Sequence, residues 1–152
     1  MVALIDVQRF FFLLSFLFVY LSPLSAFEYT KGHIVVSHPW ARVMLPKVKV
    51  GLGSLIINNY GTESDRLMSL VSDVARRTAI YEMLMENDVM KMRQVDNGVT
   101  IRSGECVVFK PSGYHIMFFD PQKPFRKGDS FKASLLFEKA GQIDVIFRVD
   151  SG

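Results

Sequence analysis

The spacing of apolar residues is the feature that most restricts how this chain can fold. After residue 26 the sequence consists of short apolar runs, each closed by a turn signal, and no segment keeps a helical period for three turns. Runs of this kind, separated by Gly, Pro, Asn and Asp, are typical of β-strands. The predicted strands are Ile34–Val36, Leu52–Asn58, Leu67–Val71, Ala79–Met85, Val89–Val95, Glu105–Phe109, Tyr114–Phe119, Ser130–Phe137 and Ile143–Val149. The pattern predicts an all-β sandwich, in which only Ser72 to Arg77 is expected to form a helical turn.

The amino-terminal segment differs from the rest of the chain. Arg9 precedes an apolar run over Phe10–Leu21, which Pro23 then interrupts. This order is typical of a secretory signal peptide, although about 18 apolar residues can also just span a bilayer as an uncleaved anchor. We expect residues 1–26 to be a signal peptide or such an anchor, and residues 27–152 to form a single β-sandwich domain outside the cytoplasm.

Composition and charge exclude several classes of protein. Hydrophobic residues make up 49% of the 152 residues and charged residues 22%, a balance that excludes intrinsic disorder. The net charge is +3, and the basic residues are scattered, so no stripe for nucleic acid is present. The one cysteine, Cys106, excludes an intramolecular disulfide and is expected to be buried in its strand. The sequence contains no Gly-x-Ser-x-Gly, His-Glu-x-x-His, P-loop or dinucleotide motif, so we expect a protein that is not an enzyme.

Four of the eight methionines fall within residues 83–92. Met83 and Met85 are two residues apart, as are Met90 and Met92, so on strands each pair points to one face. If Glu86–Val89 forms a hairpin turn, Met85 lies opposite Met90. Met83 then lies opposite Met92. The spacing therefore predicts four sulfur atoms on one face of a hairpin, and the alternative role for each methionine is to fill the core.

A second pair, His115 and Met117, has the same two-residue spacing. Thioether sulfur is a soft, uncharged donor that favours Cu(I), and neutral imidazole also suits copper. A site of these donors favours a soft monovalent ion over calcium, magnesium or structural zinc. It also remains usable in an oxidising compartment, where thiolates are lost to disulfides. The alternative for His115 is a hydrogen-bonded histidine that binds no metal.

An ordered series of short segments runs through residues 27–152. It consists of Pro39-Trp40-Ala41-Arg42, Leu55–Gly61, Glu82–Met85, Val89–Arg93, Gly113–Met117 and Phe137–Gly141. With this series the chain resembles the periplasmic copper(I) chaperones called PCuAC. The resemblance implies a cupredoxin-like or immunoglobulin-like Greek-key β-sandwich. In that family a histidine, a later methionine and a His-x-Met motif bind Cu(I), which implies Met92, His115 and Met117 as ligands here.

The first histidine of the family pattern is absent, and Tyr81 stands in its place. A neutral phenol is a hard, poor donor for Cu(I). Met83, two residues further along the same strand face and beside Met92, is the natural substitute. The predicted metal ligands are therefore Met92, His115, Met117 and Met83. A three-coordinate site without Met83, or a fold that has lost metal binding, remains open.

The resemblance implies an exported Cu(I) metallochaperone of the periplasm that delivers copper for cytochrome c oxidase assembly. Its implied partners are a copper-accepting oxidase subunit and a thiol-bearing copper chaperone. The chain is expected to act as a monomer and to bind no nucleic acid. Once the signal is cleaved, it is expected to have no membrane span. Two other functions remain open. A metal-free adaptor would use the methionine face to bind another exported protein. An electron-transfer cupredoxin would use Cys106 with His115 and Met117, and would turn intensely blue with Cu(II).

Overall fold

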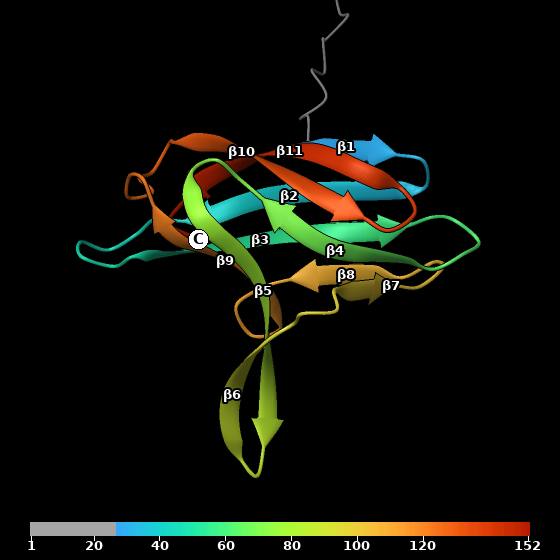
Figure 1. Cartoon of the computed structure of the whole chain (residues 1–152), viewed down its shortest axis with the longest axis horizontal. Helices are drawn as coiled ribbons and strands as arrows, with labels where there is room; N and C mark the ends of the chain where they lie inside the picture. The colour runs from blue at the N-terminus through green and yellow to red at the C-terminus, as the bar shows by residue number, and fades with distance from the viewer. Residues whose placement is uncertain (1–26) are drawn as a thin grey trace, which may run out of the picture.

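The computed structural model describes residues 27–152, and the predicted signal peptide over residues 1–26 lies outside them. This part of the chain contains no helix with the length and apolar character that crossing a membrane requires. It forms strands β1 (Glu28–Lys31), β2 (Ile34–Arg42), β3 (Val50–Asn59), β4 (Asp65–Val71), β5 (Ala75–Glu86), β6 (Val89–Gln94), β7 (Val99–Ile101), β8 (Cys106–Phe109), β9 (Tyr114–Pro121), β10 (Ser130–Phe137) and β11 (Gly141–Asp150). The prediction of an all-β fold is confirmed (Figure 1).

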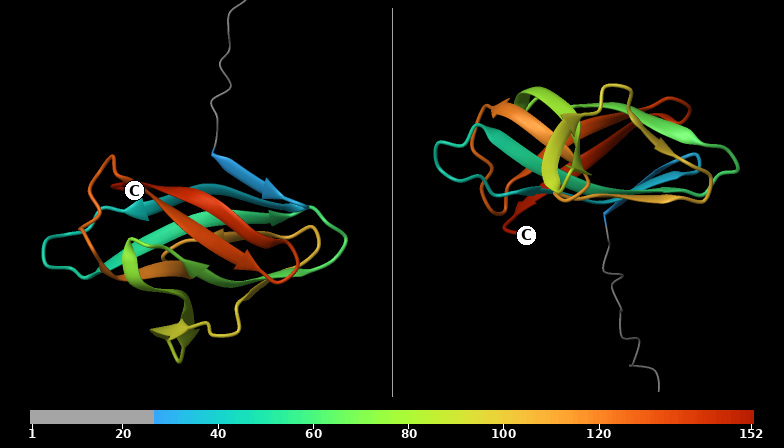
Figure 2. Two further views of the ribbon diagram at one scale, coloured as in Figure 1. Left: turned by 45° about the horizontal axis from the view of Figure 1, so that its top comes forward. Right: turned by 90° about the horizontal axis from the view of Figure 1, so that it is seen from below.

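The strands form a continuous hydrogen-bonded path that curls on itself. Its order is β6-β5-β9-β3-β2-β11-β10-β4-β7, while β1 pairs with β2 and β8 pairs with β3 off this path. β5 and β4, each one strand in from an end of the path, approach each other, and Thr78 Oγ1 on β5 donates a hydrogen bond to the carbonyl oxygen of Leu70 on β4. The strands therefore lie in two layers with the apolar side chains between them (Figure 2).

Every predicted strand is present, but the structure also differs from the sequence prediction. β1 and β7, of four and three residues, were not predicted, because neither contains a run of consecutive apolar residues. The predicted helical turn over Ser72 to Arg77 is wrong. Only Asp73 and Val74 form a turn, and β5 begins at Ala75, where it pairs with the end of β9. Long-range strand pairing thus decides the conformation of this segment.

Four phenylalanines fill one end of the core. Phe118 on β9 has its ring centroid 5.6 Å from that of Phe125, 5.1 Å from Phe131 and 5.5 Å from Phe147. Rings at such distances, tilted edge to face, add to the free energy that their buried area contributes. Phe118 is fully buried, so the cluster fixes the inner face of β9.

Two glycines on β3 make room for this cluster. A Cβ atom added to Gly53 would lie 2.7 Å from Cε2 of Phe118, and one added to Gly51 would lie 2.3 Å from Cε2 of Phe125. Both distances are too short for a side chain to be accommodated without movement of the rings. Because successive side chains of a strand alternate, holding Phe118 inward holds its neighbour Met117 on the outer face.

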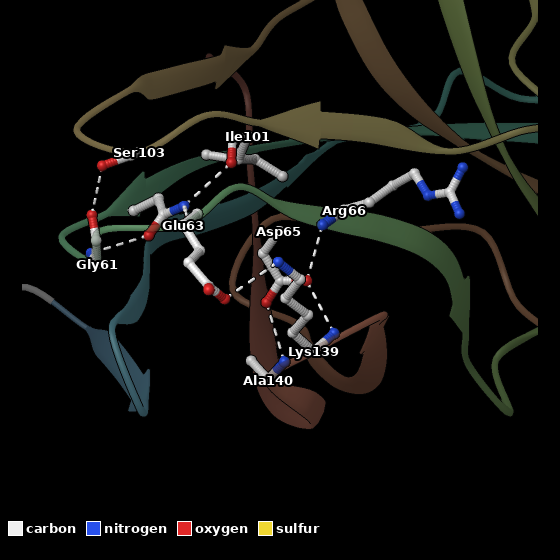
Figure 3. Close-up of polar contacts among 9 residues, drawn as sticks. Gly61, Glu63, Asp65, Arg66, Ile101, Ser103, Lys139 and Ala140 are labelled. Carbon is white, nitrogen blue, oxygen red and sulfur yellow. Dashed lines mark hydrogen bonds and ion pairs between the residues drawn. The ribbon is translucent and has the colours of Figure 1, made fainter.

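A buried amide ties the end of β3 to the neighbouring loops. The side-chain nitrogen of Asn59 donates hydrogen bonds to the carbonyl oxygens of Glu63, at 2.8 Å, and Ile101, at 3.0 Å. Its side-chain oxygen accepts one from the amide of Gly61, at 2.9 Å (Figure 3). The segment Leu55–Gly61 therefore has a structural role.

A buried carboxylate stabilises the turn between β10 and β11. Asp65 accepts hydrogen bonds from the backbone amides of Arg66, at 2.7 Å, Lys139, at 2.9 Å, and Ala140, at 2.9 Å (Figure 3). Hydrogen bonds to an ionised acceptor are stronger than neutral ones. The segment Phe137–Gly141 is therefore also structural, and neither segment lies at the methionines.

We predict that Gly53→Ala lowers the free energy of unfolding by about 1–3 kcal/mol, because the added methyl group overpacks the Phe118 cluster. Gly113→Ala is the matched control, since the nearest atom to its added Cβ is Cγ of Lys110 at 4.0 Å. Urea unfolding of the two variants and the parent chain measures the effect. Equal midpoints for all three proteins would contradict the prediction.

Candidate metal centre

The β5–β6 hairpin turns at two residues with left-handed backbone. Asn87 has φ 49° and Asp88 has φ 61°, which is the conformation of the two-residue turn that suits twisted antiparallel strands. Asn and Asp tolerate this region better than other residues with a Cβ. The turn closes on the pair Glu86 and Val89. The register of the hairpin follows from this turn.

The predicted methionine pairs are confirmed by the register. Met85 pairs with Met90, and Met83 pairs with Met92. The amide of Met83 donates to the carbonyl oxygen of Gly113, the residue before β9, at 3.1 Å, so this amide points away from β6. In an antiparallel ladder, a residue whose amide points away from the partner strand belongs to a non-hydrogen-bonded pair. The Cα atoms of such a pair lie about 4.5 Å apart. Each pair can therefore bring its two sulfur atoms to one ion.

Three of these methionines are exposed. Met85 has 64% of its surface exposed, Met92 51% and Met90 49%, while Met83 is half-buried. The hairpin projects from the body of the protein, as Figure 1 shows. Filling the core, the alternative role for methionine, therefore does not account for these three side chains.

The charged residues of the hairpin lie on its other face. Glu82 forms an ion pair with Arg93 at 3.2 Å, and Glu86 forms one with Lys91 at 2.8 Å. Burial raises the pKa of the Tyr114 phenol on the same side, and the Glu82 carboxylate adds to this rise. The methionine face of the hairpin ladder carries only uncharged side chains, which are Tyr81, Met83, Met85, Met90, Met92 and Gln94.

His115 lies on the outer face of β9 and yet only 3% of its surface is exposed. Its Nδ1 lies 3.0 Å from the carbonyl oxygen of Gly113. Because a carbonyl oxygen only accepts, this contact places the proton on Nδ1 and leaves the lone pair on Nε2. A backbone carbonyl that fixes the ring in this way is a common support for a metal-binding histidine.

Tyr81 covers this part of β9. It pairs with His115 in one ladder and with Gln94 in the other. Its ring centroid lies 6.3 Å from that of His115 and 6.1 Å from that of Phe119, so the ring lies over the stretch of β9 that contains Met117. Its hydroxyl donates to Oε1 of Gln94 at 3.1 Å. The phenol is thus engaged in a hydrogen bond on the hairpin.

The structure brings some of the predicted ligands closer together than others. Met83 and Met92 are direct neighbours, and Met83 is diagonal to His115, since Tyr81 is paired with the histidine. Diagonal neighbours lie about 7–8 Å apart, within reach of long side chains. Met117 pairs with Ala79, on the far side of the Tyr81 rung. It is the most distant member of the predicted set.

Sequence reasoning missed two groups that organise this region. The carbonyl of Gly113 orients His115, and Gln94 accepts a hydrogen bond from Tyr81 and another from Arg77, at 3.3 Å. The guanidinium carbon of Arg77 lies 4.0 Å from the ring centroid of Phe119. Extending the predicted hairpin register by two residues would have found Gln94, which pairs with Tyr81. The role of Gly113 depends on side-chain conformation and has no sequence signal.

The prediction that Cys106 is buried is wrong, because it is exposed on β8. Val107 and Phe109 point inward, so the alternation of the strand turns Cys106 outward. Cys106 pairs with Asn58 on β3, whereas Ile116, the neighbour of His115, pairs with Gly53 on the same strand. Asn58 and Gly53 lie about 17 Å apart along β3. The thiol is therefore not brought to His115. Among residues 27–152 no three His, Cys, Asp or Glu side chains gather where they could share a metal ion.

Solved structures have the same fold. The apo PCuAC domain from PmoF1 matches with a TM-score of 0.70 and 22% identity, over 82% of this chain and 99% of that domain. The copper-bound PCuAC domain from PmoF2 matches with a TM-score of 0.68 and 23% identity, over 82% of this chain and 98% of that domain. The Cu(I) form of DR1885 from Deinococcus radiodurans matches with a TM-score of 0.60 and 16% identity, over 75% of this chain and 76% of that one. The chain therefore has the cupredoxin-like fold of PCuAC domains, as the resemblance implied.

Sequence comparison defines the family. Residues 34–149 match the family model described as "Putative lipoprotein LpqE-like", and the chain belongs to this family. It is also 30% identical, over 103 residues, to the uncharacterized protein RP573 of Rickettsia prowazekii (strain Madrid E). That match covers 66% of this chain and 57% of the curated relative.

We predict that His115 is a single tautomer with its proton on Nδ1. Long-range proton–nitrogen NMR in mildly alkaline solution should show a protonated Nδ1 and an unprotonated Nε2. The exposed residues His33 and His38 are internal controls and should show averaged signals from two exchanging tautomers. A protonated Nε2 on His115 would contradict the hydrogen bond to Gly113.

Proposed function

We propose that this chain is an exported Cu(I) metallochaperone that carries the ion on the outer face of β5, β6 and β9. The observation that carries the proposal is the position of the Met83 and Met92 pair, diagonal to the free Nε2 of His115. These donors are soft or borderline and uncharged, which selects Cu(I). Two of the proteins that share the fold are described in their copper-bound forms, which supports the choice of ion.

We assign a ligand role to each of the four predicted residues. Met83 and Met92 supply two sulfur atoms from one rung of the hairpin, and His115 supplies Nε2. Met117 supplies the third sulfur when the Tyr81 ring moves aside. That movement breaks the exposed hydrogen bond to Gln94, which contributes little net stability, and it also separates the ring from those of His115 and Phe119.

The proposed site suits transfer rather than storage. None of the ligands is charged and Met92 on the hairpin is 51% exposed, so thiolates or imidazoles of a partner can reach the ion from that side and replace the ligands one at a time. The resemblance to PCuAC suggests a cytochrome c oxidase subunit as the recipient and a thiol copper chaperone as a second partner. In this proposal no bond of a substrate is broken, and the protein is not an enzyme.

The proposed location is the periplasm. The lipoprotein description of the family supports export. The apolar run over Phe10–Leu21 supports a signal peptide over residues 1–26, and residues 27–152 would then act as one monomeric domain.

We predict that Met92→Leu and His115→Ala each weaken Cu(I) binding by about tenfold or more, the factor expected for losing 1.4 kcal/mol of binding free energy. An anaerobic competition titration against a chromogenic Cu(I) chelator measures the affinity. Every protein carries Cys106→Ser, so that the exposed thiol does not bind the ion.

Met68→Leu is the matched control for this titration, because Met68 is a solitary exposed methionine on β4. The control should bind Cu(I) as the parent does. Since His115 is buried, thermal unfolding checks that its replacement still folds, and exposed Met92 avoids that concern. Unchanged affinity in both variants would remove the proposed site and favour the metal-free adaptor.

We predict that two replacements of Tyr81 affect the Cu(I) affinity differently. Tyr81→Phe should leave the Cu(I) affinity unchanged, since the phenol is not a ligand. Tyr81→His should raise it by about tenfold or more, because an imidazole is added directly opposite His115. The same titration measures both. Loss of binding in Tyr81→Phe would make the phenol a ligand, and no gain in Tyr81→His would place position 81 beyond the reach of the ion.

A further inference from the structure

The outermost rung of the hairpin has no part in the site proposed above. Met85 and Met90 pair across β5 and β6, next to the turn. They are 64% and 49% exposed, so neither side chain packs in the core. Two large apolar side chains placed side by side in water at the end of a projecting hairpin need a reason other than stability.

The geometry of this rung suits a shared ion. Met85 and Met90 occupy a non-hydrogen-bonded pair, like Met83 and Met92 two residues further in, so their Cβ atoms lie about 5 Å apart. Each methionine side chain has three rotatable bonds. Both sulfur atoms can therefore turn toward one ion that lies above the rung.

The donors around this rung favour a soft ion over a hard cation. The flanking acids, Glu82 and Glu86, face the other side of the hairpin and are paired with Arg93 and Lys91. Asp88 lies in the turn, beyond the last pair of the ladder, and within the ladder Met85 and Met90 form the outermost pair on their face. Thioethers without carboxylates bind soft monovalent ions.

We propose that Met85 and Met90 form a second soft-metal site at the hairpin tip. An ion bound there lies about 7 Å from the rung of Met83 and Met92, the distance of two residues along a strand. The long side chains of neighbouring rungs can then exchange the ion without releasing it to water. The tip is the point where Cu(I) enters or leaves, and the chain binds two ions. This use of the tip rests on the proposed function, whereas the site itself does not.

The test follows methionine methyl signals while Ag(I), a soft monovalent ion that does not change oxidation state, is added to the full chain. The methionines carry ¹³C-labelled methyl groups, and the protein carries Cys106→Ser. We expect Met83 and Met92 to shift with the first equivalent, and Met85 and Met90 to shift with the second. Met68 is the internal control, because it is 44% exposed but has no methionine opposite.

A double variant, Met85→Leu with Met90→Leu, should weaken the second binding step by about tenfold or more and leave the first unchanged. Leucine nearly conserves the volume of methionine, and both positions are exposed, so folding should not be affected. Met68→Leu is the control variant and should retain both steps.

The outcomes separate this site from the inner one. The tip site is overturned if the Met85 and Met90 methyl signals stay unmoved after two equivalents, or if they move only in parallel with Met68, as adsorption to any exposed thioether would produce. If Met85 and Met90 shift while Met83 and Met92 do not, the tip site stands and the inner site of the proposed function fails. If only Met83 and Met92 shift, the inner site stands and the tip site fails.

Discussion

The alignment of β5 between β6 and β9 is the constraint on which the candidate site depends. A slip of one residue would turn every methionine of the hairpin to the charged face. Two features prevent the slip. The turn at Asn87 and Asp88 sets the pairing with β6, and the bond from the Met83 amide to Gly113 sets the pairing with β9. Burial of Ile80 on the inward face of β5 stabilises the same alignment.

The molecule separates the residues that stabilise it from those that would bind a ligand. The phenylalanine cluster and the buried polar groups of Asn59 and Asp65 stabilise the strands and loops of the body of the protein, outside the hairpin. The methionine face contributes little to the core. Because most of the candidate ligands lie outside the core, the ligands of such a fold can change while the fold is kept. The fold shared with PCuAC domains, at identities of 16–23%, is consistent with that independence.

Tyr81 is the residue through which this chain departs most from the pattern it resembles. Its position is central, since it pairs with His115 on one side and Gln94 on the other. An aromatic ring there buries His115 and separates Met117 from the hairpin. The soft donors that remain accessible lie further out, on the rungs of Met83 and Met85. The proposed sites therefore use the methionines of these rungs.

Nine of the strands and the methionine pairs could be predicted from the sequence, because alternation and a two-residue turn are local properties. The sequence also determined the kind of donor available. Three other features could not be predicted in this way: Ser72 to Arg77 is not helical, Cys106 is exposed, and His115 is buried with the Tyr81 ring stacked on it. Each of these depends on which strand lies alongside, and a chain curled into two layers makes those neighbours from segments far apart in sequence.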